Sequence, residues 1–309
     1  MNLFIISKGL VLSLLSIFVY NVYIKVFKGL KQTEREEGLE RHKTKNGTIT
    51  MGGIIFIILP LFFISYDEHI KVIVIGLLGF GIIGFIDDLL IIFLKKNDGL
   101  KAYVKLIIEV IIASLIFFMY LKLNFSTKIT LFNIEVDLKW FFGILILWLL
   151  TASSNAWNLT DGVDGLCAGL SIIIGLGLMA IAYKKAEYAI FNLLFFFNIT
   201  LFVFWCLNFP KAFLFMGDVG SLALGAFYAS ISIFLNCILS FAIISGIFIF
   251  ETISVMLQVF YYKKTKGKRL FKMAPFHHHL EACGLNEIQI DLILYSIQVV
   301  LVIIGFVII

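Results

Sequence analysis

Two adjacent aspartates interrupt one of the most apolar stretches of this sequence. Asp87 and Asp88 stand inside an apolar run that opens at Ile70 and continues to Leu94. A carboxylate within a bilayer costs about 3 kcal/mol or more and usually marks the path of an ion or a substrate. Because neighbouring helical residues point about 100° apart, the two carboxylates cannot serve one partner equally. The pair therefore predicts a shallowly buried site for a divalent metal or a proton acceptor.

A second polar segment, NAWNLTDGVDG at 155–165, repeats polar residues every three positions. Asn155, Asn158, Asp161 and Asp164 would share one face of a helix at this spacing. An Asx-rich turn explains the glycines of this segment, but it does not explain a stripe of two amides and two carboxylates. The stripe favours a binding or catalytic face at the end of a membrane helix.

The segment FMGDVGS at 215–221 places Asp218 between glycines at the start of another apolar run. An aspartate in this position could simply cap a helix. A helix N-terminus beside glycines also suits phosphate, and Mg²⁺ commonly binds one or two carboxylates together with substrate phosphates. Asp218 could therefore cap a helix or contribute to a site for phosphate and Mg²⁺.

Three consecutive histidines occur in APFHHHLE at 274–281. His277, His278 and His279 cannot all share one helical face, so a three-ligand zinc site made from them alone is not expected. Histidine at neutral pH can bind phosphate oxygens or carry a proton. With Lys45 and Lys105 in other polar segments, these side chains suit a phosphorylated substrate.

The elements that must position these residues are membrane helices. The 309 residues are 61% hydrophobic and 15% charged, with a mean hydropathy of +1.03, far more apolar than soluble domains. We expect one all-α polytopic membrane domain over 1–309 with about ten transmembrane helices, and a small hairpin at 123–138. The expected spans are 3–24, 51–66, 70–90, 104–122, 140–157, 166–183, 187–207, 219–235, 237–260 and 288–309.

The distribution of positive charge predicts the orientation. Alternate loops hold 18 of the 25 lysines and arginines, which marks these loops as cytoplasmic and places both termini outside. This topology explains the net charge of +5 without nucleic acid as a partner. The loops are 25–48, 87–105, 155–165, 208–218 and 263–287, and they contain every polar segment described above. We therefore expect one active site on the cytoplasmic face, where positioning and a metal would support phosphoryl transfer to a membrane-embedded acceptor.

Four segments together resemble a known family: FIDDLL, NAWNLTDGVDGL, FMGDVGSLALG and MAPFHHHLEACG. They are similar to the polyprenyl-phosphate N-acetylhexosamine-1-phosphate transferase superfamily, and within it to the bacterial phospho-N-acetylmuramoyl-pentapeptide-transferases. The resemblance runs from about Thr44 to Gln298. It implies a multi-pass protein of the bacterial cell membrane with a cytoplasmic, Mg²⁺-dependent active site. The implied reaction moves phospho-MurNAc-pentapeptide from UDP-MurNAc-pentapeptide to undecaprenyl phosphate, giving lipid I and UMP for peptidoglycan synthesis.

The resemblance also implies roles for individual residues. Asp87 would deprotonate the lipid phosphate, Asp164 would lie near the nucleoside, and Phe215 would stack on uracil. The expected catalytic residues are Asp87, Asp88, Asp161, His277 and His278, and the expected metal ligand is Asp218. The expected substrate-binding residues are Lys45, Thr50, Lys105, Asn155, Asn158, Asp164, Asn208, Phe215 and His279. One departure is Ile49, which stands where the family has proline in TPTMGG.

Several alternatives stay open at the level of sequence. A sister enzyme that transfers GlcNAc-1-phosphate to the same lipid would share the aspartates, although its histidine motif usually reads HxHH. An ion-coupled transporter would also carry acidic residues, but these usually lie near the bilayer midplane in symmetric repeats, and no repeat is visible here. Asp87 could act as a base or as a nucleophile. The oligomeric state is open, with a homodimer as one candidate.

Overall fold

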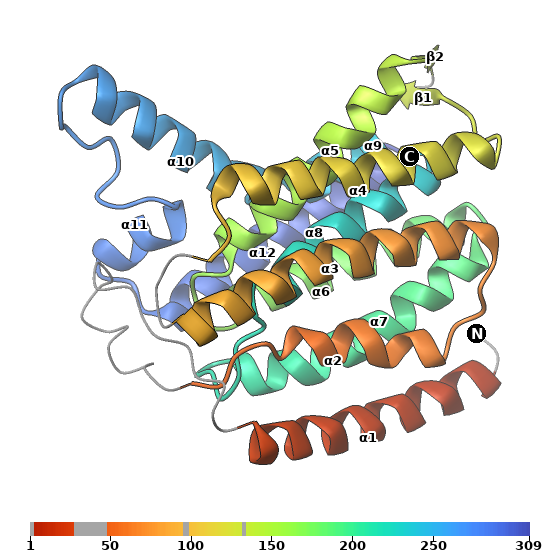
Figure 1. Cartoon of the computed structure of the whole chain (residues 1–309), viewed down its shortest axis with the longest axis horizontal. Coiled ribbons are helices and arrows are strands. Elements are labelled where there is room, and N and C mark those ends of the chain that lie inside the picture. Colours follow the sequence, from red (N-terminus) through yellow and green to blue (C-terminus); the bar gives the residue numbers. More distant parts are fainter. Residues whose placement is uncertain (1–2, 28–47, 95–98, 132–133) are drawn as a thin grey trace.

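The computed structural model describes residues 3–27, 48–94, 99–131 and 134–309, and these form a long helical bundle (Figure 1). The α-helices are α1 (Leu3–Val26), α2 (Gly53–Ile58), α3 (Glu68–Leu94), α4 (Ala102–Lys122), α5 (Phe141–Thr160), α6 (Leu166–Lys184), α7 (Tyr188–Asn208), α8 (Gly217–Phe234), α9 (Ile238–Ile244), α10 (Gly246–Lys264), α11 (Phe276–Ala282) and α12 (Glu287–Val307). A 3₁₀ helix, η2 (Leu59–Phe62), continues α2, and two short strands are β1 (Lys128–Leu131) and β2 (Ile134–Asp137).

Among the described residues, eight helices are long and apolar enough to cross a membrane. A ninth span is formed if α9 and α10, which meet at a 69° bend, are counted together. The all-α polytopic fold is thus confirmed, but the expected span at 51–66 is shorter than predicted. It is the ten-residue apolar helix Gly53–Phe62, which rises only about 15 Å against a hydrocarbon core of about 30 Å. Polar residues 65–68 and the 3₁₀ geometry at Pro60 end it early.

Polar side chains define where two of the spanning helices begin. The Asp67 carboxylate accepts a hydrogen bond from the Ile70 N–H at 2.8 Å, which satisfies one free donor at the start of α3. At the start of α12, Asn286 and Gln289 form a reciprocal capping box. These contacts set the ends of the helices that carry Asp87 and Asp88 and that support the histidine segment.

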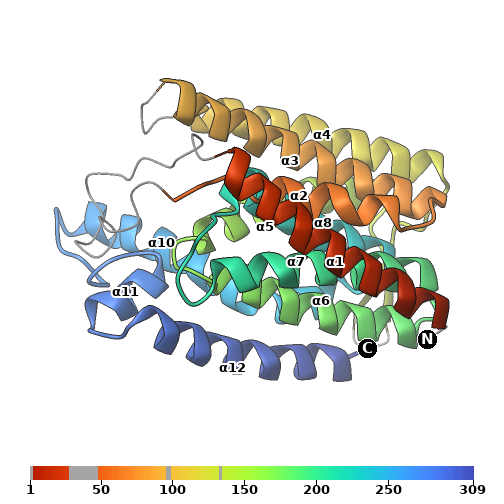
Figure 2. The same ribbon diagram turned by 90° about the horizontal axis from the view of Figure 1, so that it is seen from below.

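The centre of the bundle is α8, of which 83% of the spanning window is buried. Helices α3 and α5 pack along it, whereas α1, α4 and α12 lie at the periphery (Figure 2). Peripheral helices expose apolar side chains such as Leu14, Phe118 and Ile303, as helices that face lipid tails do. The helix with Asp218 at its start is therefore the one that most of the fold surrounds.

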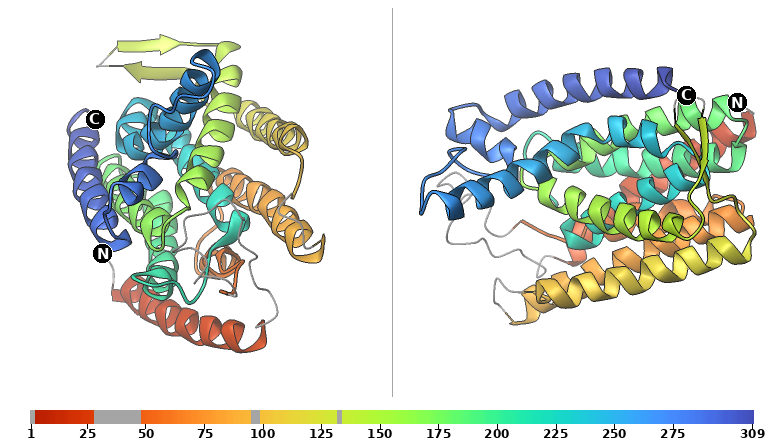
Figure 3. Two further views of the ribbon diagram at one scale, coloured as in Figure 1. Left: turned by 90° about the vertical axis from the view of Figure 1, so that its left-hand side faces the viewer. Right: turned by 90° about the horizontal axis from the view of Figure 1, so that it is seen from above.

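The two ends of the bundle differ in character. Both termini and the β1–β2 hairpin lie at one end, and α11 with the end of α10 lies at the other (Figure 3). The strands pair antiparallel, with Lys128 opposite Asp137 and Leu131 opposite Ile134, which confirms the hairpin predicted at 123–138. The polar segments gather at the end that carries α11.

Candidate active site

Three helices bring carboxylates and a lysine together at this end of the bundle. The Lys105 ammonium from the first turns of α4 lies 2.7 Å from Asp218 Oδ2 on α8 and 3.5 Å from Asp87 Oδ2 on α3. The Asp87 and Asp218 carboxyl groups are in contact with each other. Partial burial of all three side chains reduces solvent screening, so these contacts are stronger than those of an exposed ion pair. We call Asp87, Asp88, Asp218 and Lys105 the carboxylate cluster.

Asp88 faces a different partner from Asp87. Its two carboxylate oxygens accept hydrogen bonds from the backbone N–H groups of Asp218 and Val219, at 3.0 and 3.1 Å. These donors are among the unpaired N–H groups at the start of α8, where the helix dipole also favours negative charge. Asp87 instead accepts a short hydrogen bond of 2.5 Å from the Leu100 N–H. Asp88 therefore fixes the start of α8, and Asp87 keeps its second oxygen toward Lys105 and Asp218.

Two glycines allow α3 and α8 to meet at the cluster. A side chain at Gly84 would collide with the backbone carbonyl of Asp218, so only glycine permits this approach. Gly217 has a φ of +74° at the turn into α8, a conformation that other residues adopt at a cost. The FMGDVGS segment can therefore turn sharply and present Asp218 to α3.

The polar face of α5 lies beside the cluster and extends away from it. Asn158 donates a hydrogen bond to Ser221 Oγ at 3.0 Å and contacts the Asp218 carboxylate. Asn155, one turn earlier, donates at 2.8 Å to a buried glutamate of α4. Asp161 directly follows α5 as its C-cap residue, and its catalytic role stays a prediction. The structure thus brings Asn158 to the carboxylate cluster and turns Asn155 toward α4.

The turn that follows α5 is held by backbone contacts. Asp164 Oδ2 accepts from the Ala212 N–H at 2.9 Å, and the Asn208 carboxamide accepts from the Gly165 N–H at 2.7 Å. Asn208 also donates to the Leu214 carbonyl at 2.9 Å, so both ends of its amide are engaged. These contacts join the end of α5 to the loop that precedes α8. The substrate-binding role expected for Asn208 stays a prediction.

The three histidines on α11 point in different directions. The fully buried His277 ring lies against Gly162 of the α5 turn, 4.2 Å from the His278 ring by centroids. His278 Nδ1 lies 2.6 Å from Glu281 Oε2. His279 is turned away, because its Nδ1 accepts from the Lys272 N–H at 3.2 Å. The structure therefore brings His277 and His278 against the turn that follows α5, and it directs His279 away from this turn.

The segment before the histidines is anchored by α10. Glu251 is fully buried, and both of its carboxylate oxygens accept from the His277 backbone N–H, at 3.1 and 3.2 Å. Gln258, two turns further on, accepts from the Leu270 and Phe271 N–H groups. Glu251 and Gln258 were not among the predicted site residues. A glutamate within a spanning helix is rare, and this is the sequence signal that could have found Glu251.

A loop at 48–53 lies beside the start of α8. The Phe215 N–H donates to the Ile49 carbonyl at 2.8 Å, and the Gly52 N–H donates to the Phe215 carbonyl at 2.9 Å. Tyr23 of α1 donates to the Thr50 carbonyl at 2.9 Å. The structure thus places Thr50 and Phe215 next to each other. Lys45 lies outside the described residues.

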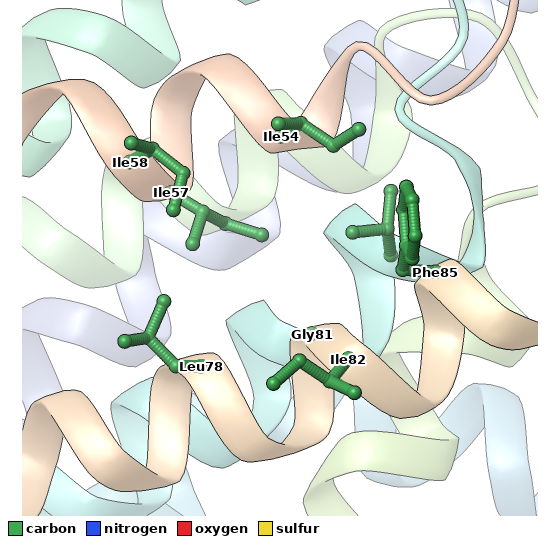
Figure 4. A pocket seen from close by; sticks show the side chains of 8 residues that line it. Ile54, Ile57, Ile58, Leu78, Gly81, Ile82 and Phe85 are labelled. Carbon is green, nitrogen blue, oxygen red and sulfur yellow. The ribbon is translucent and has the colours of Figure 1, made fainter.

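An apolar groove of about 150 Å³ lies between α2 and α3, close to the cluster. Its walls are entirely hydrocarbon, with Ile54 and Ile57 on one side and Leu78 and Ile82 on the other (Figure 4). Val219, whose N–H binds Asp88, also lines it. A hydrocarbon chain in this groove would have its end beside the carboxylate cluster.

The cluster has the donor chemistry of a site for a hard divalent cation. Asp87 and Asp218 present carboxylate oxygens to one point, which Lys105 Nζ approaches at 3.5 and 2.7 Å. Within the described part of the chain, no group of three or more His, Cys, Asp or Glu is arranged to hold a metal ion by itself. Mg²⁺ does not need such a group, since it commonly takes one or two carboxylates and completes its shell with substrate phosphates and water. The carboxylates of Asp87 and Asp218 therefore fit a Mg²⁺ ion.

The profile of glycosyl transferase family 4 matches residues 70–236, which include both aspartates of α3 and the start of α8. The chain belongs to this family. Curated relatives align over nearly their whole length. The phospho-N-acetylmuramoyl-pentapeptide-transferase of Staphylococcus saprophyticus is 39% identical over 308 residues, with 94% of this chain and 95% of the relative covered. Those of Enterococcus faecalis and Acetivibrio thermocellus are each 37% identical, covering 93% and 94% of this chain and 92% and 91% of the relatives.

These relatives confirm the resemblance found in the sequence motifs. The relatives are named as muramoyl-pentapeptide transferases, and they cover nearly the whole chain. The comparison therefore does not favour the GlcNAc-1-phosphate transferase or the transporter. With its spanning helices, this family 4 chain is a multi-pass membrane protein. The roles of individual residues stay predictions.

Proposed function

We propose that this chain transfers phospho-MurNAc-pentapeptide from UDP-MurNAc-pentapeptide to undecaprenyl phosphate, releasing UMP and forming lipid I for peptidoglycan synthesis. The observation that carries the proposal is the meeting of Asp87, Lys105 and Asp218 at one end of a membrane bundle. The histidine segment lies at the same end, and a hydrocarbon-lined groove opens beside the cluster. A soluble nucleotide donor and a lipid acceptor would both reach such a site.

In this proposal, the position of each side chain decides its role in the reaction. Asp87 accepts the proton of the lipid phosphate, because Asp88 has both oxygens bound to the backbone of α8. The freed phosphate oxygen bonds to the β-phosphorus of the donor. The bond from that phosphorus to the oxygen bridging it to UMP breaks, and UMP leaves with this oxygen. His277 and His278, across the α5 turn, would bind the phosphates or the sugar.

The proposed cation is Mg²⁺, held by Asp218 and Asp87. When bound it would offset the charge of the phosphates and hold them in line for displacement. Lys105 lies between the same two carboxylates and offsets part of their negative charge. Asn158 would keep the Asp218 carboxylate in position through their contact.

The positive-inside distribution supports a cytoplasmic site. Among the described residues, the segment 263–272, which spans the end of α10 and the loop after it, carries five lysines and one arginine and lies at the end that carries α11. We therefore place this end in the cytoplasm and the termini outside. A homodimer stays a prediction, which the mass of the detergent-solubilised protein would check.

Release of UMP by the purified protein tests the function. The protein would be incubated in detergent with undecaprenyl phosphate and Mg²⁺, once with UDP-MurNAc-pentapeptide and once with UDP-GlcNAc. We expect UMP and a lipid-linked product only from the first donor. Turnover with UDP-GlcNAc alone would instead identify the sister activity. No turnover with either donor, from protein that remains folded, would contradict the proposal.

A further inference from the structure

Glu109 is a buried acid that none of the sequence motifs contains. It lies in the second turn of α4 with 1% of its surface exposed. Its Oε2 accepts the hydrogen bond from Asn155 at 2.8 Å, and its Oε1 has no hydrogen-bond partner among the described residues. A carboxylate with an unsatisfied oxygen in a spanning helix is costly. One hydrogen bond from the neutral amide of Asn155 does not offset the cost of burying this carboxylate.

Lys105 precedes Glu109 by four residues on the same helix. Residues at this spacing lie on one face, so the lysine can reach the glutamate by rotating its long side chain. In the structure it extends instead to Asp218 and Asp87. The Lys105 ammonium thus occupies the point on which the two proposed metal-binding carboxylates converge.

A lysine and a divalent cation cannot both occupy this point without repulsion. A buried ammonium that leaves its carboxylates needs another acceptor, because an unpaired buried charge is strongly unfavourable. Glu109 Oε1 offers one a single turn away on α4, still without a partner among the described residues. The Lys105 ammonium therefore has two alternative acceptors. One is the pair of carboxylates of Asp87 and Asp218, and the other is the carboxylate of Glu109.

We propose that Glu109 is a positioning residue that receives the Lys105 ammonium when Asp87 and Asp218 bind a divalent cation. The inference rests on the metal of the proposed function. It assigns Glu109 a role in tuning cation affinity, since it offsets the loss of the contacts that Lys105 leaves. Asn155, which holds Glu109 Oε2, would keep Oε1 directed for this exchange.

Direct binding of Mn²⁺, followed by electron paramagnetic resonance of the free ion, tests the exchange without turnover. The protein is the full chain in detergent, with Mn²⁺ in place of Mg²⁺. Glu109→Gln keeps an oxygen acceptor for Asn155 but removes the negative charge. We expect its Mn²⁺ dissociation constant to rise about tenfold, as for the loss of one partly buried charge pair. Glu135→Gln in β2, at the opposite end of the bundle, is the matched control and should leave the constant unchanged.

The same titration in a Lys105→Met background separates this role from a structural one. Without the ammonium, Glu109→Gln should change the dissociation constant by less than about twofold, which makes the coupling between the two sites measurable. Lys105→Met alone should bind Mn²⁺ more tightly than the natural chain, because the competing cation is absent. If Glu109→Gln does not fold, Lys105→Met still tests the competition on which the exchange depends, and Mn²⁺ binding no tighter than in the natural chain would overturn it.

Glu109→Gln can give two results that would overturn the inference while leaving the proposed function in place. These are an unchanged Mn²⁺ dissociation constant, and a rise of equal size with and without Lys105. Weaker binding in Lys105→Met would also overturn it, because the lysine would then support the cation. If the natural chain binds no Mn²⁺ yet makes lipid I, the exchange is wrong. If it binds Mn²⁺ but releases no UMP, the proposed function fails and the exchange can still be measured.

Discussion

At the scale of single residues, side chains that are neighbours in the sequence make different contacts. Asp87 faces Lys105 and Asp218, whereas Asp88 binds the backbone at the start of α8. His277 lies against the α5 turn, but His279 is bonded to the Lys272 N–H. Adjacent side chains on a helix point about 100° apart. Within each motif, some residues therefore face the site and others hold the surrounding elements in place.

The substitution Asp218→Asn tests the proposed metal ligand. The amide keeps the shape of the side chain but removes the charge that holds Lys105 and the cation. We expect UMP release to fall roughly 100-fold or more, the size of a lost metal contact worth about 3 kcal/mol in the transition state. Phe215→Ala should instead mainly raise KM for the nucleotide donor. A near-normal rate of Asp218→Asn at ordinary Mg²⁺ would show that the metal is bound elsewhere.

The histidines provide a paired test on one short helix. We expect His277→Asn to lower kcat roughly 100-fold, a typical effect for a proton-transfer or phosphate-binding group. His279→Asn should keep kcat within about fivefold of the natural value, because His279 contacts Lys272 rather than the α5 turn. Steady-state kinetics with both variants would check this order. The reverse order would mean that α11 rotates when substrate binds.

At the scale of elements, the site depends on how closely α3 approaches α8. Gly84 lies against the Asp218 carbonyl with no room for a side chain, and Asp88 then ties the two helices together. The contact uses backbone and polar groups, which suits helix packing in lipid, where the hydrophobic effect does not drive association. A small outward shift of α3 would separate Asp87 from Asp218 and Lys105.

Gly84→Ala should therefore destabilise the protein and lower its activity. Overpacking of this kind costs about 1–3 kcal/mol, so we expect a lower unfolding temperature in detergent together with slower UMP release. Gly81→Ala on the same helix is the control, since its added carbon would lie 3.5 Å or more from its neighbours, an ordinary contact. Equal melting temperatures for the two variants would contradict a close α3–α8 contact.

At the scale of the whole molecule, polar groups that are far apart in the chain share one end of the bundle. Helix α11 lies at this end, and the β1–β2 hairpin lies at the other with both termini (Figure 3). All four cysteines are free, and Cys206 and Cys283 are exposed. Cys283 follows α11 directly, so it reports the side of the membrane on which the histidines lie.

Labelling of cysteines in cells tests the orientation. In a Cys206→Ser background, we expect Cys283 to react with a membrane-impermeant maleimide only after the cells are permeabilised. Ile134→Cys, at an exposed position of the hairpin, should react in intact cells. Reversed accessibility would invert the proposed orientation, and equal accessibility would contradict the placement of the two segments at opposite ends.

The sequence by itself determined the membrane class and the polar segments. Charged residues inside apolar runs are costly, so the residue order alone marks Asp87, Asp88 and Asp218 as functional candidates. Only the tertiary structure decided which of their oxygens are available, because Asp88 is held by backbone N–H groups of another helix. It also decided that the helical part of the expected span at 51–66 is only the ten residues Gly53–Phe62 and that Lys105 meets Asp87 and Asp218. Hydropathy and periodicity report the environment of one segment, whereas these contacts depend on the approach of helices from distant parts of the chain.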